Sequence, residues 1–325
     1  MNNIVLMSLL AVAGVPAIQV GYIVLAEHLL QRLPEKRQWT LRPWLWLAPA
    51  LFFLTVFLFY PAASTLSLSF LDAGSDRFVG LQNYFFTFTD REMLVSFRNN
   101  LLWLTLFTVL TVGLGLVIAV LTDQAKYETI VKSVMFLPMS ISFVAASVIW
   151  RFIYEFRPAG APQIGSLNAL LMAMVPDFQP VAWLVNRLTN NIALILVATW
   201  VWAGFCLVIL SAALKGIPTE ILEAARVDGA AEWQVFKRVI VPMLAPTIIV
   251  AATTMVIYSL KAFDVVYVMT NGNFDTEVIA NRMYKEMFNF RDFGRASAIA
   301  VVLFGATVPV MLANIRRFRQ QEAMR

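Results

Sequence analysis

The sequence predicts an all-α protein that crosses a membrane about seven times. Apolar residues make up 60% of the 325 residues and charged residues only 14%, whereas a typical soluble domain is about 25% charged. The mean hydropathy is +0.73. Several stretches without Asp, Glu, Lys or Arg are long enough to form a helix across a hydrocarbon layer of roughly 30 Å. The composition therefore excludes a disordered chain, a collagen-like chain and an ordinary soluble enzyme.

These charge-free stretches give the predicted spanning helices in chain order: residues 4–26, 44–70, 101–122, 133–150, 192–214, 239–260 and 296–315. The first stretch has no Lys or Arg before it or within it. It therefore lacks the positive n-region of a signal peptide, and we interpret it as a retained helix. The stretch at 133–150 is the shortest. A further apolar run, 166–175, is too short to span and is predicted to form an interfacial or re-entrant helix.

The basic residues predict the orientation of the helices. If the N-terminus lies outside, Lys and Arg are about twofold denser in the loops that then face the cytoplasm, as the positive-inside rule requires. The net charge of +5 then reflects the cytoplasmic face and does not indicate a nucleic-acid partner. Cys206 and His28 are the only residues of their types, so the chain offers neither an internal disulfide nor a Cys/His metal site.

The cytoplasmic loop at 217–242 has the pattern of two short helices joined by a tight turn. Pro218 suits the first turn of a helix, and Gly229 suits the left-handed residue that ends one. A second helix is predicted from Ala231 onward, with Trp233, Phe236 and Ile240 on one apolar face. Small side chains keep one side of this loop shallow, so that a partner can approach closely: Ala224, Ala225, Gly229 and Ala230. Without a partner, the same loop would be a connector that packs on its own bundle.

The residue pattern of this loop resembles the coupling loop of the permeases of binding-protein-dependent carbohydrate ABC importers. Glu223-Ala224-Ala225 is followed after three residues by Gly229 and after nine more by Val239-Ile240-Val241-Pro242, where the family's usual ending is Ile-x-Leu-Pro. Other segments also resemble sugar permeases of the maltose type: 78–84, 136–150, 165–168, 263–272 and 293–298. The resemblance runs from about Trp44 to the C-terminus.

The resemblance implies two segments. Residues 1–43 would be an additional N-terminal transmembrane helix with a cytoplasmic linker. Residues 44–325 would be a six-helix permease domain of the type I importer fold. It also implies a multi-pass protein of the bacterial inner membrane, with the N-terminus outside and the C-terminus inside. The sequence around Thr270-Asn271-Gly272-Asn273 is similar to permeases for α-glucosides and glucosyl osmolytes.

The resemblance further implies partner subunits that supply ATP hydrolysis, a second half of the path and delivery of the sugar. No Gly-x-x-x-x-Gly-Lys-Ser/Thr motif occurs, so ATP and Mg²⁺ would be bound by two cytoplasmic ATPase subunits and no cofactor by this chain. A second, distinct permease would share the translocation path, and an external solute-binding protein would deliver the sugar. The residues that the resemblance assigns to ATPase coupling are Glu223, Ala224, Ala225, Asp228, Gly229 and Ala230. Asp228 and Arg226 also suit local capping or an ion pair.

The sugar path is expected near the bilayer midplane, from aromatic and hydroxyl side chains on two helices. The candidates are Trp202 and Phe205 on one helix and Tyr258 and Ser259 on another. The alternative interpretation is that these aromatic side chains only pack inside the bundle or face lipid. Ala198 and Ala262 stand where the maltose-type pocket would carry amides, which argues against maltose itself. An α-glucoside, a disaccharide or a glucosylglycerol-like osmolyte is the expected substrate.

Two other classes compete with the importer subunit. The first is a secondary transporter or channel that acts alone on a small polar solute. The charge-free stretches offer no mid-membrane acid for proton coupling, although they allow a passive pore. The second is a membrane enzyme, for which the sequence shows no nucleophile–base pair and no catalytic or metal-ligating cluster.

Overall fold

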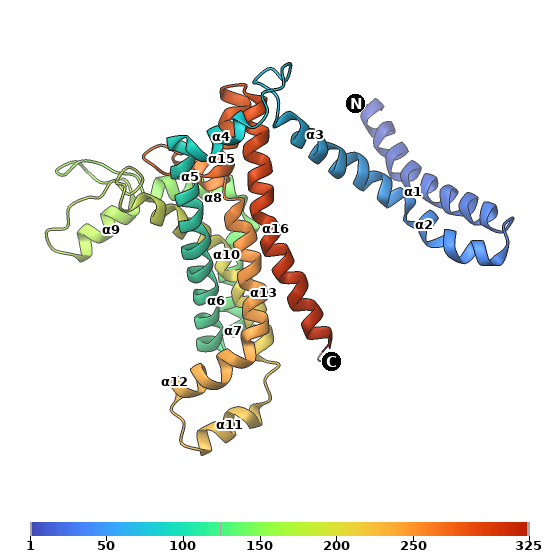
Figure 1. The fold of residues 1–325 in the computed structure, drawn as a ribbon. Coiled ribbons are helices and arrows are strands. Elements are labelled where there is room, and N and C mark those ends of the chain that lie inside the picture. The colour runs from blue at the N-terminus through green and yellow to red at the C-terminus, as the bar shows by residue number, and fades with distance from the viewer. Residues whose placement is uncertain (1, 124, 324–325) are drawn as a thin grey trace. The chain divides into compact units, whose positions relative to one another are not determined.

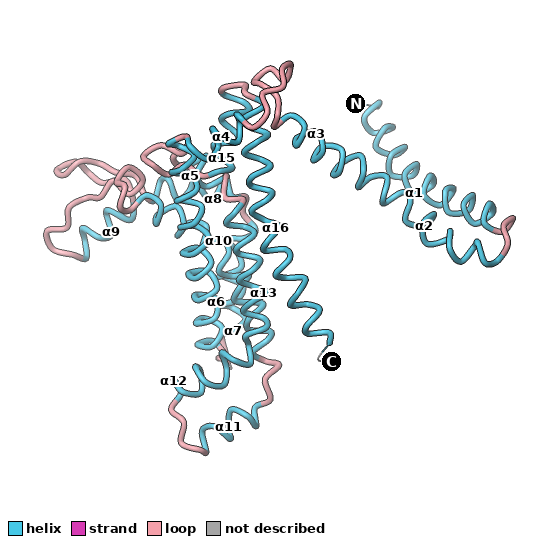
Figure 2. The backbone as a smooth tube through the Cα atoms, viewed as in Figure 1, coloured by secondary structure: helices cyan, strands magenta, loops and turns pink. Residues whose placement is uncertain are grey.

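A computed structural model describes residues 2–123 and 125–323, and nearly all of the described chain is helical (Figures 1 and 2). The only strand-like pairing in these ranges is an isolated antiparallel bridge between Leu71 and Phe78. The chain divides into two compact units, residues 1–67 and residues 68–325. The boundary predicted between residues 43 and 44 separates an additional N-terminal helix from the permease domain. It is a different kind of division from the two compact units, and it stays a prediction.

The first unit is a pair of helices and their continuation: α1 (Asn2–Leu30), α2 (Glu35–Leu54), a π-helical turn (Thr55–Phe59) and α3 (Tyr60–Leu68). The Glu27 carboxylate on α1 accepts hydrogen bonds from Arg42 and Trp46 on α2, both at 2.9 Å. From Glu35 to Leu68 the helix is long and apolar enough to cross a membrane, and its most apolar window buries nothing within the chain. Such a helix is suited to a lipid environment.

The second unit is a bundle with short helices at both ends (Figure 1). Its long helices are α5 (Arg91–Leu102) continued through a π-helical turn (Trp103–Phe107) into α6 (Thr108–Thr122), α10 (Asn190–Leu214), α13 (Val241–Leu260) and α16 (Phe293–Ala323). Its shorter helices are α4 (Gln82–Thr89), α7 (Glu128–Phe136), α8 (Phe143–Ile153), α9 (Ser166–Met174), α11 (Thr219–Val227), α12 (Glu232–Val235), α14 (Asp264–Met269) and α15 (Ile279–Tyr284). Helix α9 confirms that the run at 166–175 is helical.

The described residues hold five helices long and apolar enough to span, or six if a bent pair counts as one span. The prediction of one continuous helix at 133–150 is wrong, because the chain bends by 102° between α7 and α8. Pro138 has no N–H to continue α7, and a 3₁₀ turn, Leu137–Ser140, follows instead. Ser142 then caps α8 by accepting the Ala145 N–H at 3.2 Å. The remaining predicted stretch, 4–26, lies within α1, and about half of its side chains, all before residue 17, lie outside the described residues.

Helix α10 is the centre of the bundle, because it is apolar on every side and packs against α6, α7 and α13. Large side chains from α10, α6 and α13 fill the core around it, including Leu194, Leu207 and Met255, which are fully buried. Gly204 lets α10 approach the broken span closely. A Cβ at this position would lie 2.1 Å from the Met135 carbonyl oxygen.

We expect Gly204→Ala to destabilise the protein by about 1–3 kcal/mol, because the added methyl group must push α10 away from α7. The matched control is Gly113→Ala on α6, where a Cβ would meet nothing within 4 Å. It should be neutral or stabilising by up to about 1 kcal/mol, since alanine favours the helix. Thermal unfolding of the two purified variants in detergent compares them. Equal midpoints would show that the α7–α10 contact is not tight.

Candidate functional site

The loop at 217–242 forms helices α11 and α12 at the end of the bundle opposite α4 and α15 (Figure 1). Gly229 has φ +84°, the left-handed conformation that was predicted. Its N–H donates to the Arg226 carbonyl at 3.0 Å, and the Ala230 N–H donates to the Ala225 carbonyl at 3.1 Å. These two bonds are the Schellman pattern that ends a helix. Pro218 lies one residue before α11, at its N-cap, rather than in the first turn.

A small core holds the loop against the ends of α10 and α13. It consists of Leu214, Ile217, Leu222, Val235, Ile240 and Leu244, all at most 8% exposed. The predicted apolar face at Trp233, Phe236 and Ile240 is therefore only partly right: Ile240 is buried, whereas Trp233 is 66% exposed. The reason is a π-helical turn at Phe236–Ile240. Its wider spacing places Val235 and Ile240, five residues apart, on the same buried side.

The coupling candidates differ in exposure. Ala225 and Ala230 pack partly against the core of the loop, whereas Ala224, Asp228 and Gly229 are exposed. A single ion pair ties the two helices together across the turn, from Arg226 to Glu232 at 2.7 Å.

The Glu223 carboxylate is exposed on α11 and makes no ion pair or hydrogen bond within the described residues. The same holds for Asp228, so its predicted local ion pair is not present. Three apolar side chains of the same loop are also exposed: Ile221, Val227 and Trp233. An unpaired carboxylate in a loop that also exposes apolar groups is suited to bind a protein partner.

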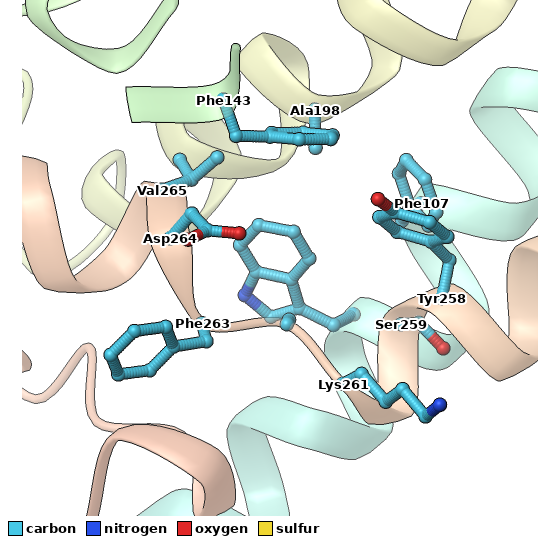
Figure 3. Close-up of a pocket in the computed structure, with 11 residues that line it drawn as sticks. Phe107, Phe143, Ala198, Tyr258, Ser259, Lys261, Phe263, Asp264 and Val265 are labelled. Carbon is cyan, nitrogen blue, oxygen red and sulfur yellow. The ribbon is translucent and has the colours of Figure 1, made fainter. Parts of the chain in front are cut away.

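The second candidate site is a small hollow that is partly open to its surroundings. Eleven residues line it, from the α5–α6 helix, α8, α10, α13, α14 and the connection between α13 and α14 (Figure 3). Tyr258 and Ser259, both predicted, belong to this lining. The Ser259 hydroxyl donates to the Val256 carbonyl of its own helix at 2.7 Å, so in this conformation it is turned to the backbone. Ala198 and Ala262 also line the hollow, which leaves no amide at either position.

The predicted aromatic residues of α10 lie behind this wall rather than in it. The Trp202 ring is 4.1 Å from the Tyr258 ring, centroid to centroid, and 5.5 Å from the Phe205 ring. Trp202 is only 8% exposed. The structure thus brings Trp202, Phe205 and Tyr258 together in one aromatic cluster, in which Tyr258 alone faces the hollow.

The sequence pattern missed several lining residues, among them Trp103, Phe107, Phe143 and Asp264. Phe143 is the first residue of α8, and its ring lies 5.7 Å from that of Tyr258. The break after Pro138 directs it there, so a prediction of that break would have been the signal. Trp103 and Phe107 sit at the two ends of a π-helical turn, which carried no sequence signal. Within the described residues, no group of three or more His, Cys, Asp or Glu could hold a metal ion.

Comparison with known proteins decides the family. A model of the family described as "binding-protein-dependent transport system inner membrane component" matches residues 111–318. The chain belongs to this family. As an inner membrane component of a binding-protein-dependent transport system, it is a multi-pass permease, and the predicted family of importer permeases is confirmed. The coupling roles assigned to the loop residues stay predictions.

Two relatives within the family are similar over most of the chain. The osmoprotective compounds uptake permease protein GgtC of Synechocystis is 58% identical over 281 residues, covering 86% of this chain and all of the relative. The alpha-glucoside transport system permease protein AglF of Rhizobium meliloti is 48% identical over 278 residues, covering 85% of this chain and 82% of the relative.

The fold is also similar to a solved structure, that of a bacterial ABC transporter involved in the import of the acidic polysaccharide alginate. The superposition gives a TM-score of 0.73 at 22% identity, over 87% of this chain and 96% of the other. At that identity the likeness concerns the fold alone. The predicted all-α permease fold of the type I importers is confirmed.

Proposed function

We propose that this permease is one of two distinct transmembrane subunits of an ATP-driven importer for α-glucosides or glucosyl osmolytes. It forms half of the translocation path and takes its energy from two ATPase subunits, which bind ATP and Mg²⁺ and dock on residues 217–242. An extracytoplasmic solute-binding protein delivers the sugar. The single observation that carries this proposal is the coupling loop, with the unpaired Glu223 on its exposed surface.

The construction of the loop supports transmission of force. Its core of buried side chains joins the end of α10 to the start of α13, and its turn is closed by the Gly229 hydrogen bonds. A partner that pulls on α11 therefore moves both long helices, because packed elements transmit displacement. Ala224 on the exposed side permits a close approach. Gly229, Ala225 and Ala230 fix the shape of the loop, and the exposed Asp228 is available to the partner.

The hollow supports a sugar-class solute. Ligand sites combine aromatic and apolar walls with a few polar groups, and here Phe143 and Tyr258 supply the walls. Trp202 and Phe205 fix the position of Tyr258, and Ser259 contributes a hydroxyl once it turns from its backbone partner. The names of the relatives GgtC and AglF support the same class, namely osmoprotective compounds and alpha-glucosides.

The orientation follows the basic residues: N-terminus outside and C-terminus inside the bacterial inner membrane. In this orientation α11 and α12 face the cytoplasm, and α4, α9 and α15 face outward with the loops around them. Residues 1–43 supply the additional helix and the cytoplasmic linker, and residues 44–325 supply the permease domain.

Affinity purification of the tagged full-length chain from its native membrane tests the proposal. We expect an ATPase subunit and a second, different permease to co-purify, and ATPase activity to rise when sugar-loaded binding protein is added. Reconstituted chain that carries a polar solute without ATP and without any partner would contradict the proposal and favour a stand-alone transporter or channel.

A further inference from the structure

The hollow contains a carboxylate, that of Asp264, without a hydrogen-bond or ion-pair partner among the described residues. Asp264 is the first residue of α14, and Figure 3 shows its carboxylate extending beneath the Phe143 ring toward the interior of the hollow. The other charged side chain in the lining, Lys261, extends away from it (Figure 3). Within the described residues, Asp264 has no side-chain hydrogen bond and no ion pair. Its two oxygens therefore keep their full capacity to accept hydrogen bonds.

The backbone beneath Asp264 is held firmly. The next two residues, Val265 and Val266, are buried in the main core. The rings of Phe263 and Tyr267 stack at 5.1 Å, and the Tyr267 N–H donates to the Phe263 carbonyl at 2.8 Å. A carboxylate on a rigid backbone is held in one position and is therefore preorganised to bind a ligand. A carboxylate that only contacts water gains nothing from a rigid backbone.

A second observation at the same hollow points to a ligand. The Trp103 side chain lines it and is only 3% exposed, and its indole N–H has no hydrogen-bond partner. Buried donors without a partner are rare in native proteins. The hollow thus combines a free acceptor with aromatic walls, and one of its lining residues, Trp103, has a buried indole N–H without a partner. Hydroxyl groups both donate and accept, so a polyol satisfies this combination, whereas an apolar solute or a cation alone does not.

We propose that Asp264 is the residue that positions the sugar in the path, by accepting hydrogen bonds from two adjacent hydroxyls of a neutral glucoside. The Trp103 N–H donates to a third sugar oxygen when the hollow widens around the ligand. This assignment rests on the proposed function and names the polar contacts of its path. The competing role for Asp264 is structural, because a carboxylate in the first turn of a helix stabilises the helix dipole.

The test uses the complete importer, with both permeases and the ATPases, in proteoliposomes with ATP inside and binding protein outside. The probes are radiolabelled sucrose, trehalose and maltose. In Asp264→Leu, which keeps the size of the side chain but no acceptor, we expect the KM of uptake to rise by at least about tenfold. In Asp264→Asn, which keeps one acceptor oxygen, we expect a smaller rise. Stimulation of the ATPase by loaded binding protein should persist in both. Asp76→Leu, at an exposed carboxylate outside the hollow, is the matched control.

Deoxy analogues of the transported sugar separate a sugar contact from a structural role. If Asp264 accepts from two hydroxyls, the analogue that lacks one of them should be transported about tenfold less well than the parent sugar by the wild type. Asp264→Leu should treat the two sugars alike, because the contact is already lost.

Equal penalties for every analogue in the wild type and in Asp264→Leu would overturn the assignment, and so would an unchanged KM in that variant. A wild-type complex that shows neither uptake of the three sugars nor ATPase stimulation would instead overturn the proposed function, and with it this assignment.

Discussion

Glu223→Ala is expected to abolish ATP-coupled uptake while the permease still folds and reaches the membrane. The carboxylate is exposed and unpaired within the described chain, so its loss costs the isolated permease almost nothing. In the assembled importer it would be a desolvated contact to the ATPase, and removing one partner of such a contact costs about 2–5 kcal/mol. Uptake of radiolabelled sugar into proteoliposomes measures the loss.

The matched control is Glu35→Ala, an exposed carboxylate at the start of α2 and outside the loop. It should retain wild-type uptake. Normal uptake in Glu223→Ala, with the ATPase still bound, would refute the role of this residue in docking.

Tyr258→Ala is expected to reduce sugar uptake by at least about tenfold, because it removes the one aromatic ring of the predicted cluster that faces the hollow. Burial of an aromatic ring contributes about 1.5–3 kcal/mol. Tyr258 is 38% exposed, so the truncation leaves a smaller cavity than one at the buried Trp202 would.

Tyr258→Phe is the matched variant, since it keeps the ring and loses only the hydroxyl. We expect it to retain most of the uptake, with a modest rise in KM. If the alanine and phenylalanine variants both transport like the wild type, the sugar does not pass this wall.

The sequence was sufficient for the parts of the fold that depend on hydropathy and local turn chemistry. The spanning helix α10 follows from its unbroken apolar run, and the turn at Gly229 follows from the preference for glycine at a left-handed position. The exposed Glu223 on a short helix was likewise predictable from the residue pattern of the loop. These features are local, so that no tertiary contact is needed to specify them.

The sequence was insufficient where the backbone departs from regular α-helix. The break after Pro138 was missed because a hydropathy window records apolar length and not direction. The wrong face at Trp233 arose because a helical period of 3.6 residues was applied across a π-helical turn. The same limit hid Trp103 and Phe143, whose positions in the hollow depend on a π-helical turn and on the break.

Cysteine cross-linking at position 224 tests the central claim most directly. The only native cysteine, Cys206, is buried, so Ala224→Cys introduces a single accessible thiol on the exposed side of α11. If the ATPase docks on residues 217–242, this thiol will cross-link to a cysteine placed in the ATPase docking groove and will be shielded from membrane-impermeant maleimide in the assembled complex. A thiol at position 224 that is labelled from the external face of intact cells, or that stays freely reactive in a complex with bound ATPase, would contradict the account.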